Sequence, residues 1–237
     1  MNALLVDLDD TLLDYSSGVD ESWRDACVAC CAPAGVDGEA LVQAVAETRR
    51  WFWNDPARNR EERVNMLRAW QRIAGHAMAS LGVAREGLDA AIARAYADRR
   101  RAVMQLFPDA RATLEHLRGR GLPLALVTNG DTRQQRDKIE RFDLAVLFDV
   151  IVIEGEFGAG KPDEAVYRHV LDRLRVAPHD AVMVGDHLEF DVDGPQRVGL
   201  RGVWIDRQGA GLPDGSHVRP YRIIRSLREL TAGRGVT

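Results

Sequence analysis

Long hydrophobic runs and paired cysteines are both missing from this sequence. No apolar stretch approaches the roughly 20 residues that a membrane-spanning helix requires, and no basic segment followed by an apolar signal core opens the chain. The three cysteines, Cys27, Cys30 and Cys31, are odd in number, and no second Cys/His pair stands at the spacing of a zinc site. We therefore expect a cytoplasmic protein without membrane contacts, whose three thiols lie buried on a helix.

A strong excess of charge of either sign is also absent. The 237 residues carry a net charge of −4, and 46% are hydrophobic, which is ordinary for a globular protein with a sizeable core. Nothing in this balance attracts nucleic acid, so we do not expect it as a partner. The length suits one large domain, or a medium domain with a smaller companion, and leaves open whether the protein is a monomer or a homodimer.

The chain is organised around an N-terminal run of branched apolar residues that ends abruptly in acids. The first half of residues 1–12 is a short apolar run with the composition of a strand buried on both faces of a parallel sheet. Asp7 and Asp9 follow, and strand alternation places their side chains on the same side. Ligands bind at the carboxyl ends of such strands, so both carboxylates are candidates for a reactive edge. Their mutual repulsion calls for a cation or a shared proton.

Residues 17–105 show no convincing strand and predict successive helices. Apolar residues recur three and four positions apart at Val64, Leu67 and Trp70, and again at Leu88, Ile92 and Ala95. The large aromatic residues of this segment are Trp23, Trp51, Phe52, Trp53 and Trp70. We expect them to fill a helical core, except that residues 51–53 cannot all face one way and could line a pocket. The charged run 58–63 predicts a solvated face, from which an arginine could alternatively reach a substrate anion.

From residue 107 onward, helices and strands alternate with short connections. The pattern predicts helices over 109–120, 132–142, 162–175 and 191–198 and strands over 122–128, 148–153, 181–185 and 202–205. A surface loop over 208–220 and a short strand or turn with a closing helix over 221–230 complete the chain. Such alternation predicts an α/β fold with a Rossmann-like parallel sheet covered by helices on both faces. We expect residues 1–16 and 106–237 to form this core and residues 17–105 to be an inserted helical domain.

Polar residues stand where the later strands end. Thr128, Asn129 and Gly130 can offer hydroxyl, amide and backbone donors to phosphate oxygens, although Thr-Asn-Gly is also a common turn. Residues 155–161 have the GxxxxGK spacing of a nucleotide-binding phosphate loop, but Pro162 comes next and supplies neither a hydroxyl for Mg²⁺ nor an N–H. We therefore expect Lys161 to be a lone cation at the start of a helix that Pro162 opens.

Two further carboxylates follow the predicted strand 181–185. Asp186 could complete an oxygen-rich Mg²⁺ site with Asp7 and the carbonyl of Asp9. Asp191 is better placed to orient Lys161 or a metal-bound water. The sequence thus predicts acids, a hydroxyl, a lysine and acids at the ends of four strands.

In this order, these residues resemble the four motifs of the haloacid dehalogenase-like (HAD) superfamily of hydrolases. The motifs would be Asp7-Leu8-Asp9-Asp10-Thr11, then Thr128, then Lys161, and then Gly185-Asp186 with Asp191. The resemblance covers the whole chain, because many members insert a helical cap between the first and second motifs, where residues 17–105 lie. It is specific to the superfamily and not to a substrate.

The resemblance implies Mg²⁺-dependent hydrolysis of a small phosphorylated metabolite through an aspartyl-phosphate. Asp7 would attack phosphorus, and Asp9 would protonate the leaving alcohol and then activate water. Charge on the phosphoryl oxygens would be neutralised by the metal, by Lys161 and by donors at Thr128, Asn129 and Gly130. The resemblance implies metal ligands at Asp7, Asp9 and Asp186, with Thr11 and Asp191 in support.

Three alternatives to a phosphatase remain at this stage. A haloacid dehalogenase shares the fold but needs neither Mg²⁺ nor an acid two residues after its nucleophile, so Asp9 argues against it. A sugar phosphomutase would have nearly the same motifs, and the sequence does not fully separate the two. A non-catalytic binding or regulatory module would normally have lost one of the acids.

Overall fold

The protein is described here by a computed structural model that covers residues 1–231 in detail, and the chain divides into two compact units. The core unit comprises residues 1–14 and the chain from residue 105 onward, and the helical unit comprises Tyr15–Met104. Among residues 1–231, no helix has both the length and the apolarity that crossing a bilayer would require.

The core unit is built on a six-stranded sheet in which all neighbouring strands run parallel. The strands lie in the order β5-β4-β1-β6-β7-β8. Their bounds are β1 Ala3–Val6, β4 Leu124–Thr128, β5 Val150–Ile153, β6 Ala181–Gly185, β7 Arg201–Ile205 and β8 Arg222–Ile224. The predicted α/β, Rossmann-like fold is therefore confirmed, with β1 in the middle of the sheet.

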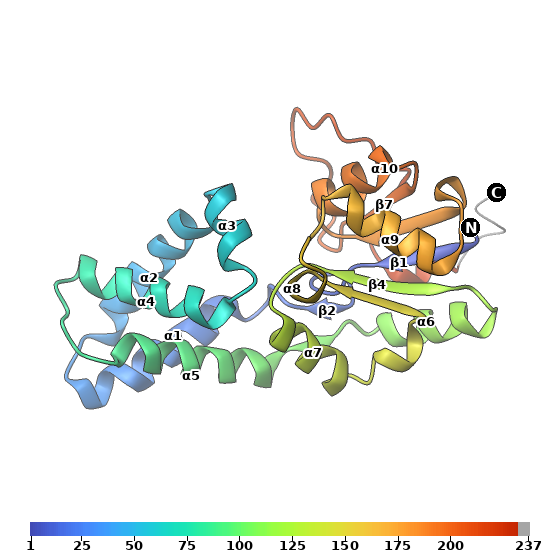
Figure 1. The fold of residues 1–237 in the computed structure, drawn as a ribbon. Helices are drawn as coiled ribbons and strands as arrows, with labels where there is room; N and C mark the ends of the chain where they lie inside the picture. Colours follow the sequence, from blue (N-terminus) through green and yellow to red (C-terminus); the bar gives the residue numbers. More distant parts are fainter. Residues whose placement is uncertain (232–237) are drawn as a thin grey trace. The chain divides into compact units, whose positions relative to one another are not determined.

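Helices cover both faces of this sheet (Figure 1). They are α6 Ala110–Gly119, α7 Thr132–Arg141, α8 Glu154–Phe157, α9 Glu164–Leu174 and α10 Gly194–Arg197, with a π-helical turn over Leu188–Asp193. On one face, Val166 and Val170 of α9 pack against Leu5 and Ala125 of the sheet. In Figure 1, α6 and α7 lie on the opposite side. All four residues of β1 are consequently buried, as the apolar run predicts.

Several local predictions need correction. Helix α9 begins at Glu164 and is capped by the Asp163 carboxylate, which accepts from the Ala165 N–H at 2.9 Å. The prediction that Pro162 opens this helix is wrong, since it precedes the capping residue. The helix predicted over 191–198 is a π-helical turn followed by the short α10. The sequence also gave no sign of α8, nor of a two-stranded antiparallel pairing between β2 (Leu13–Asp14) and β3 (Gln105–Leu106).

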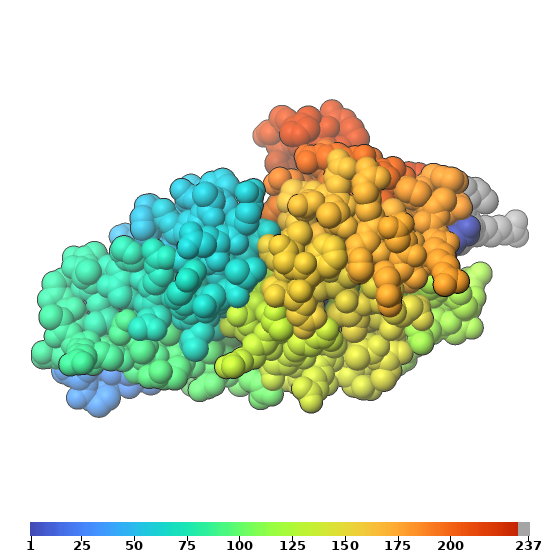
Figure 2. Space-filling view, viewed as in Figure 1, coloured from blue at the N-terminus to red at the C-terminus, as the bar shows by residue number. Residues whose placement is uncertain are grey.

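The predicted loop over 208–220 has neither helix nor strand. It stands out from the surface of the core unit and is drawn in dark orange at the top of Figure 2. After β8, the chain ends its described part in a 3₁₀ turn over Leu227–Leu230 in place of a longer closing helix.

The helical unit has a hydrophobic core of its own. Its helices are α1 Val19–Cys31, α2 Gly38–Trp53, α3 Pro56–Glu62, α4 Met66–Ser80 and α5 Leu88–Val103. Trp23 stacks on Tyr96, with ring centroids 4.0 Å apart, and Trp70 meets the same ring edge-on. The three cysteines are free thiols on α1; Cys27 and Cys31 are buried as expected, whereas Cys30 is half-buried.

Parts of the helical unit differ from the sequence pattern. Val64 precedes α4 and Leu67 lies on its exposed side, so the predicted apolar face is wrong; the buried face contains Trp70, Ile73 and Ala77. Within 51–53, Phe52 is buried and Trp51 is 53% exposed. The charged run 58–63 is not wholly solvated, because Glu62 is buried and pairs with Arg68 and Arg72.

Candidate active site

The carboxyl ends of three adjacent central strands bring the candidate residues together. Asp7 follows β1, Thr128 ends β4 and Asp186 follows β6, and β1 lies between the other two strands. The chain moves outward from β1 to β4 and β5 on one side and then returns to β6 on the other. In open sheets of this kind, ligands bind at the carboxyl ends of the strands where the strand order reverses, as it does here beside β1.

Lys161 joins two carboxylates from different parts of the chain. Its ammonium Nζ lies 2.6 Å from Asp7 Oδ1 and 2.6 Å from Asp191 Oδ1. Lys161 is 2% exposed and Asp191 1%, so both charges are held away from water. The backbone fixes Asp7, whose N–H donates to the carbonyl of Val184 on β6 at 3.0 Å.

Side-chain and backbone contacts hold Lys161 and Asp191 in place. The Asn129 amide bonds the backbone of Lys161 twice, accepting from its N–H at 2.7 Å and donating to its carbonyl at 2.7 Å. The Asp191 carboxylate accepts from the His187 N–H at 3.0 Å and lies over Gly185. A Cβ at Gly185 would stand 2.2 Å from Asp191 Cγ, so only glycine leaves room there.

Asp9 contacts a different lysine. Lys138 on α7 places its Nζ 2.8 and 2.7 Å from the two carboxylate oxygens of Asp9. Gln135, one turn earlier on α7, donates from Nε2 to Asp9 Oδ2 at 3.0 Å and to Thr128 Oγ1 at 2.5 Å. Asp9 is thereby linked to the threonine at the end of β4.

Comparison with known proteins identifies the family. Residues 1–199 match the family of haloacid dehalogenase-like hydrolases. The chain belongs to this family. Over 97% of its length it is 34% identical to a phosphoserine phosphatase of Thermus thermophilus, of which the match covers 98%. The predicted HAD resemblance is therefore confirmed.

Solved HAD structures show the same fold over nearly the whole chain. A HAD phosphatase from Thermococcus onnurineus superposes with a TM-score of 0.67 and 25% identity, covering 97% of this chain and 96% of the other. A 2-haloacid dehalogenase from Pseudomonas syringae has a TM-score of 0.66 and 28% identity, covering 98% and 97%. Phosphatases and a dehalogenase thus share this architecture, and the chemistry has to be argued from the site residues.

Burial and like charges shift the acids of this HAD site. Burial raises the pKa of Asp7 to about 7; Lys161 works against this rise, and the Asp191 carboxylate adds to it. Burial and the nearby charges of Asp7 and Asp191 raise the pKa of Asp186 to about 9. Burial alone would lower the pKa of Lys161, but Asp191 and Asp7 outweigh it and hold the pKa above its ordinary value.

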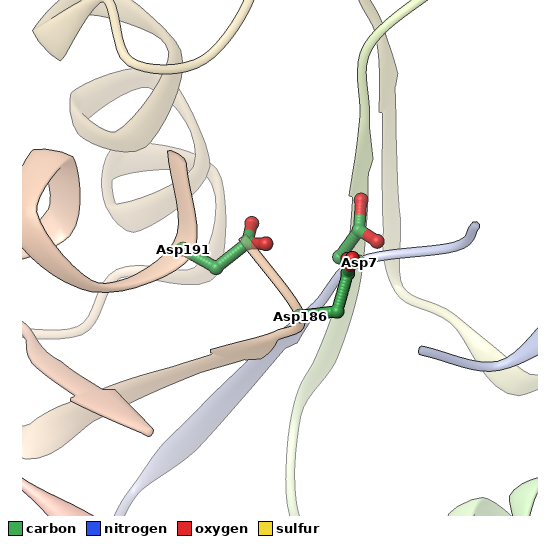
Figure 3. A group of neighbouring side chains, drawn as sticks. All are labelled: Asp7, Asp186 and Asp191. Atoms are coloured by element: carbon green, nitrogen blue, oxygen red, sulfur yellow. The ribbon is translucent and has the colours of Figure 1, made fainter. Parts of the chain in front are cut away.

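Three of these carboxylates could hold a metal ion. One oxygen each from Asp7, Asp186 and Asp191 lies within 4.8 Å of the others. Figure 3 shows the Asp7 and Asp186 carboxylates beside each other, with Asp191 pointing toward them. Clustered hard oxygen donors suit Mg²⁺, and a cation would relieve the repulsion between the acids, which adds to the effect of burial on the pKa of Asp7 and Asp186. The donor set therefore fits Mg²⁺; the carboxylate of Asp9 is not part of it.

Three other predicted residues have defined surroundings. The Gly130 N–H donates to Glu154 Oε2 at 2.9 Å, so this donor helps to fix the loop. The Asn129 side chain is likewise hydrogen-bonded to the backbone of Lys161. Thr11 is fully buried, and its hydroxyl has no hydrogen-bond partner within residues 1–231, while its carbonyl accepts from Arg207 at 2.6 Å.

Sequence reasoning missed Lys138 and Gln135. Both lie on α7, three residues apart, and therefore on one face of the helix. That spacing was available, but the sequence gives no reason to expect this face, rather than another, to meet Asp9. The rarity of lysine was a second signal, since Lys138 and Lys161 are the two lysines of the chain.

Proposed function

We propose that this HAD-like hydrolase is a Mg²⁺-dependent phosphatase that cleaves small phosphate monoesters through an aspartyl-phosphate at Asp7. The observation that carries the proposal is the convergence of Lys161, Asp186 and Asp191 on Asp7, from two other segments of the chain. This combination presents a buried nucleophile, a cation for phosphoryl oxygens and ligands for a hard metal in one place. The name of the full-length phosphoserine phosphatase relative supports the same reaction class.

The proposed reaction uses Asp7 and Asp9 in turn. An Asp7 oxygen attacks phosphorus and the bond from phosphorus to the leaving oxygen breaks, while Asp9 gives its proton to that oxygen. Asp9 then takes a proton from the water that cleaves the aspartyl-phosphate, which releases inorganic phosphate and restores Asp7. Asp7 and Asp9 follow the same strand and contact different lysines, which suits separate roles as nucleophile and as acid and base.

Charge stabilisation falls to fixed groups around Asp7. Lys161 lies within hydrogen-bond distance of Asp7, and its ammonium would pair with phosphoryl oxygens as negative charge spreads over them. The buried Thr128 hydroxyl would donate to the same oxygens. Asp7, Asp186 and the Asp9 carbonyl would hold Mg²⁺, with Asp191 and Thr11 in support. When bound, the metal supplies further positive charge to the phosphoryl group.

The helical unit is proposed to act as the cap. It interrupts the chain between Asp9 and Thr128 and carries its own hydrophobic core. In this proposal it selects the substrate and excludes bulk water from the reaction. The substrate is then a small phosphorylated metabolite.

The test is phosphate release from p-nitrophenyl phosphate and from a panel of phosphorylated metabolites that includes phosphoserine, with Mg²⁺ and with chelator. We expect turnover that requires Mg²⁺. In Asp7→Asn, turnover should fall by at least about 1,000-fold, because the nucleophile is lost. The fold, checked by circular dichroism, should be unchanged.

Asp214→Asn is the matched control, since Asp214 is an exposed acid in the 208–220 loop and should leave activity unchanged. Retained activity in Asp7→Asn would show that another group attacks phosphorus. Halide release from 2-haloacids without phosphate release would instead favour a dehalogenase. Conversion of one sugar phosphate into an isomer would favour a phosphomutase.

A further inference from the structure

Lysine is used very selectively in this chain. Of the 32 Lys and Arg residues, Lys138 and Lys161 are the two lysines, and arginines supply the other cations. Both lysines are buried, and each binds one acid of the N-terminal motif: Lys161 binds Asp7 and Lys138 binds Asp9. Lys161 has a role in the proposed chemistry, whereas Lys138 has none so far.

The contacts of Lys138 fix both oxygens of one carboxylate. Its Nζ lies 2.8 Å from Asp9 Oδ1 and 2.7 Å from Oδ2, and Gln135 holds Oδ2 from a second direction at 3.0 Å. The same Gln135 amide reaches Thr128 Oγ1 at 2.5 Å and the Asn129 carbonyl at 3.0 Å. Asp9 is therefore tied to the end of β4 and cannot turn freely about its side-chain bonds.

A fixed orientation matters for an acid that must meet one oxygen of a substrate. Holding a reacting group in the right geometry removes an entropic part of the barrier, and small displacements cost large factors in rate. A lysine ammonium is compact and has three donors, so it fits between two carboxylate oxygens at a buried position.

We propose that Lys138 is a positioning residue for Asp9, which with Gln135 orients the Asp9 carboxyl group so that its protonated form can transfer a proton to the leaving group. This inference rests on the proposed function, in which Asp9 is the acid. As the bond from phosphorus to the leaving oxygen breaks, the proton passes from Asp9 to that oxygen and the Asp7 oxygen bonds phosphorus. Lys138 keeps its own protons throughout and touches neither phosphorus nor the leaving group.

The nature of the leaving group distinguishes positioning from a merely structural role. p-Nitrophenolate leaves readily without protonation, whereas an alkoxide needs the proton from Asp9. A poorly oriented Asp9 therefore slows alkyl phosphates more than p-nitrophenyl phosphate. The kcat/KM value reports the steps up to phosphoryl transfer, and the ratio of two such values does not depend on how much of the enzyme is folded.

The experiment compares kcat/KM for p-nitrophenyl phosphate and for the alkyl phosphate that the wild-type enzyme turns over fastest. In Lys138→Met we expect the alkyl value to fall at least about 10-fold more than the aryl value, within the range that general acid catalysis contributes. Lys138→Arg retains a cation that can grip both carboxylate oxygens, and it should recover most of the lost ratio.

Arg136→Met is the matched control on the same helix. Arg136 pairs with Glu156 at the surface at 2.6 Å, so its loss removes an ion pair of α7 without touching Asp9, and the ratio should not change. If Lys138→Met fails to fold, Gln135→Leu provides the second test, with a smaller shift of the ratio in the same direction.

Equal losses on both substrates, or no loss on either, in a folded Lys138 variant would overturn the inference. A rise of KM for both substrates with an unchanged kcat would also overturn it, and would assign Lys138 to substrate binding. The proposed function fails in a different way, through an absence of phosphate release by the wild-type enzyme or through persistent activity of Asp7→Asn.

Discussion

The burial of charged side chains determines their ion pairing and their pKa values in this site. Removing one ion from water costs several kcal/mol, so the 2% exposed Lys161 depends on its two carboxylate partners. The three clustered acids together carry more charge than one lysine neutralises. Burial is the largest cause of the raised pKa of Asp7 and Asp186, and the repulsion between the clustered acids adds to it. The excess negative charge of the ionised cluster corresponds to the charge of a divalent cation.

The raised pKa values predict how stability of the metal-free protein depends on pH. In the unfolded chain an aspartate titrates near pH 3.9, whereas folded Asp7 and Asp186 titrate at about 7 and about 9. Between these values the folded state binds more protons, so the free energy of unfolding decreases as pH rises from about 4 to about 9. We expect the melting temperature in EDTA to fall across this range.

Mg²⁺ should oppose that fall, because it stabilises the ionised carboxylates that high pH creates. The increase in melting temperature produced by Mg²⁺ is therefore expected to be larger at pH 8.5 than at pH 6. Asp186→Asn removes one of the two groups, so its melting temperature in EDTA should depend less steeply on pH than that of the wild type. An unchanged slope in this variant would contradict the assignment of the dependence to Asp186.

At the level of elements, the junction between β6 and the π-helical turn is packed without spare room. Gly185 ends β6, and the Asp191 carboxylate from the turn occupies the space where a side chain would be. In Gly185→Ala, the new methyl would meet Asp191 Cγ at 2.2 Å, so Asp191 has to move away from Lys161. We expect a destabilisation of about 1–3 kcal/mol, as for overpacked sites, and a loss of most of the activity.

Gly119→Ala serves as the comparison, since no atom lies within 4 Å of a Cβ at this last position of α6. Its stability should equal or exceed that of the wild type, because alanine favours helix by about 0.5–1 kcal/mol over glycine. Denaturant unfolding and kcat measured on both variants test the prediction. If Gly185→Ala behaves like Gly119→Ala, the close approach of Asp191 to β6 does not limit the site.

Sequence periodicity predicted the strands of the sheet better than it predicted which faces of the helices are buried. A buried parallel strand such as β1 shows as a continuous apolar run, and the acids that end it mark the reactive edge directly. Lys138 was missed because nothing local shows which face of α7 meets Asp9; that depends on the packing of α7 against the sheet. The predicted apolar face with Val64 and Leu67 was wrong for the same reason, since helical spacing alone does not identify the face that becomes buried.

For the molecule as a whole, the helical unit is an insertion into a small hairpin-like pairing of the core unit. Asp14 at the end of β2 and Gln105 at the start of β3 are partners in an antiparallel ladder. The chain thus leaves and re-enters the core unit at paired positions. The hydrophobic core of the helical unit is formed entirely by residues 19–97, so no residue of the core unit contributes to it.

This pairing makes removal of the proposed cap a well-defined experiment. Replacing residues 15–104 with Asn-Gly joins Asp14 to Gln105 by a two-residue turn, the connection that suits paired antiparallel positions. We expect the shortened chain to unfold cooperatively and to retain Mg²⁺-dependent hydrolysis of p-nitrophenyl phosphate. Its preference for the best metabolite over p-nitrophenyl phosphate, measured as a ratio of kcat/KM values, should fall at least about 10-fold, since cap contacts that bind the substrate are lost. The same deletion carrying Asp7→Asn should be inactive, which would attribute the remaining activity to this site. An unchanged preference would place substrate selection in the core unit and remove the basis for calling the helical unit a cap.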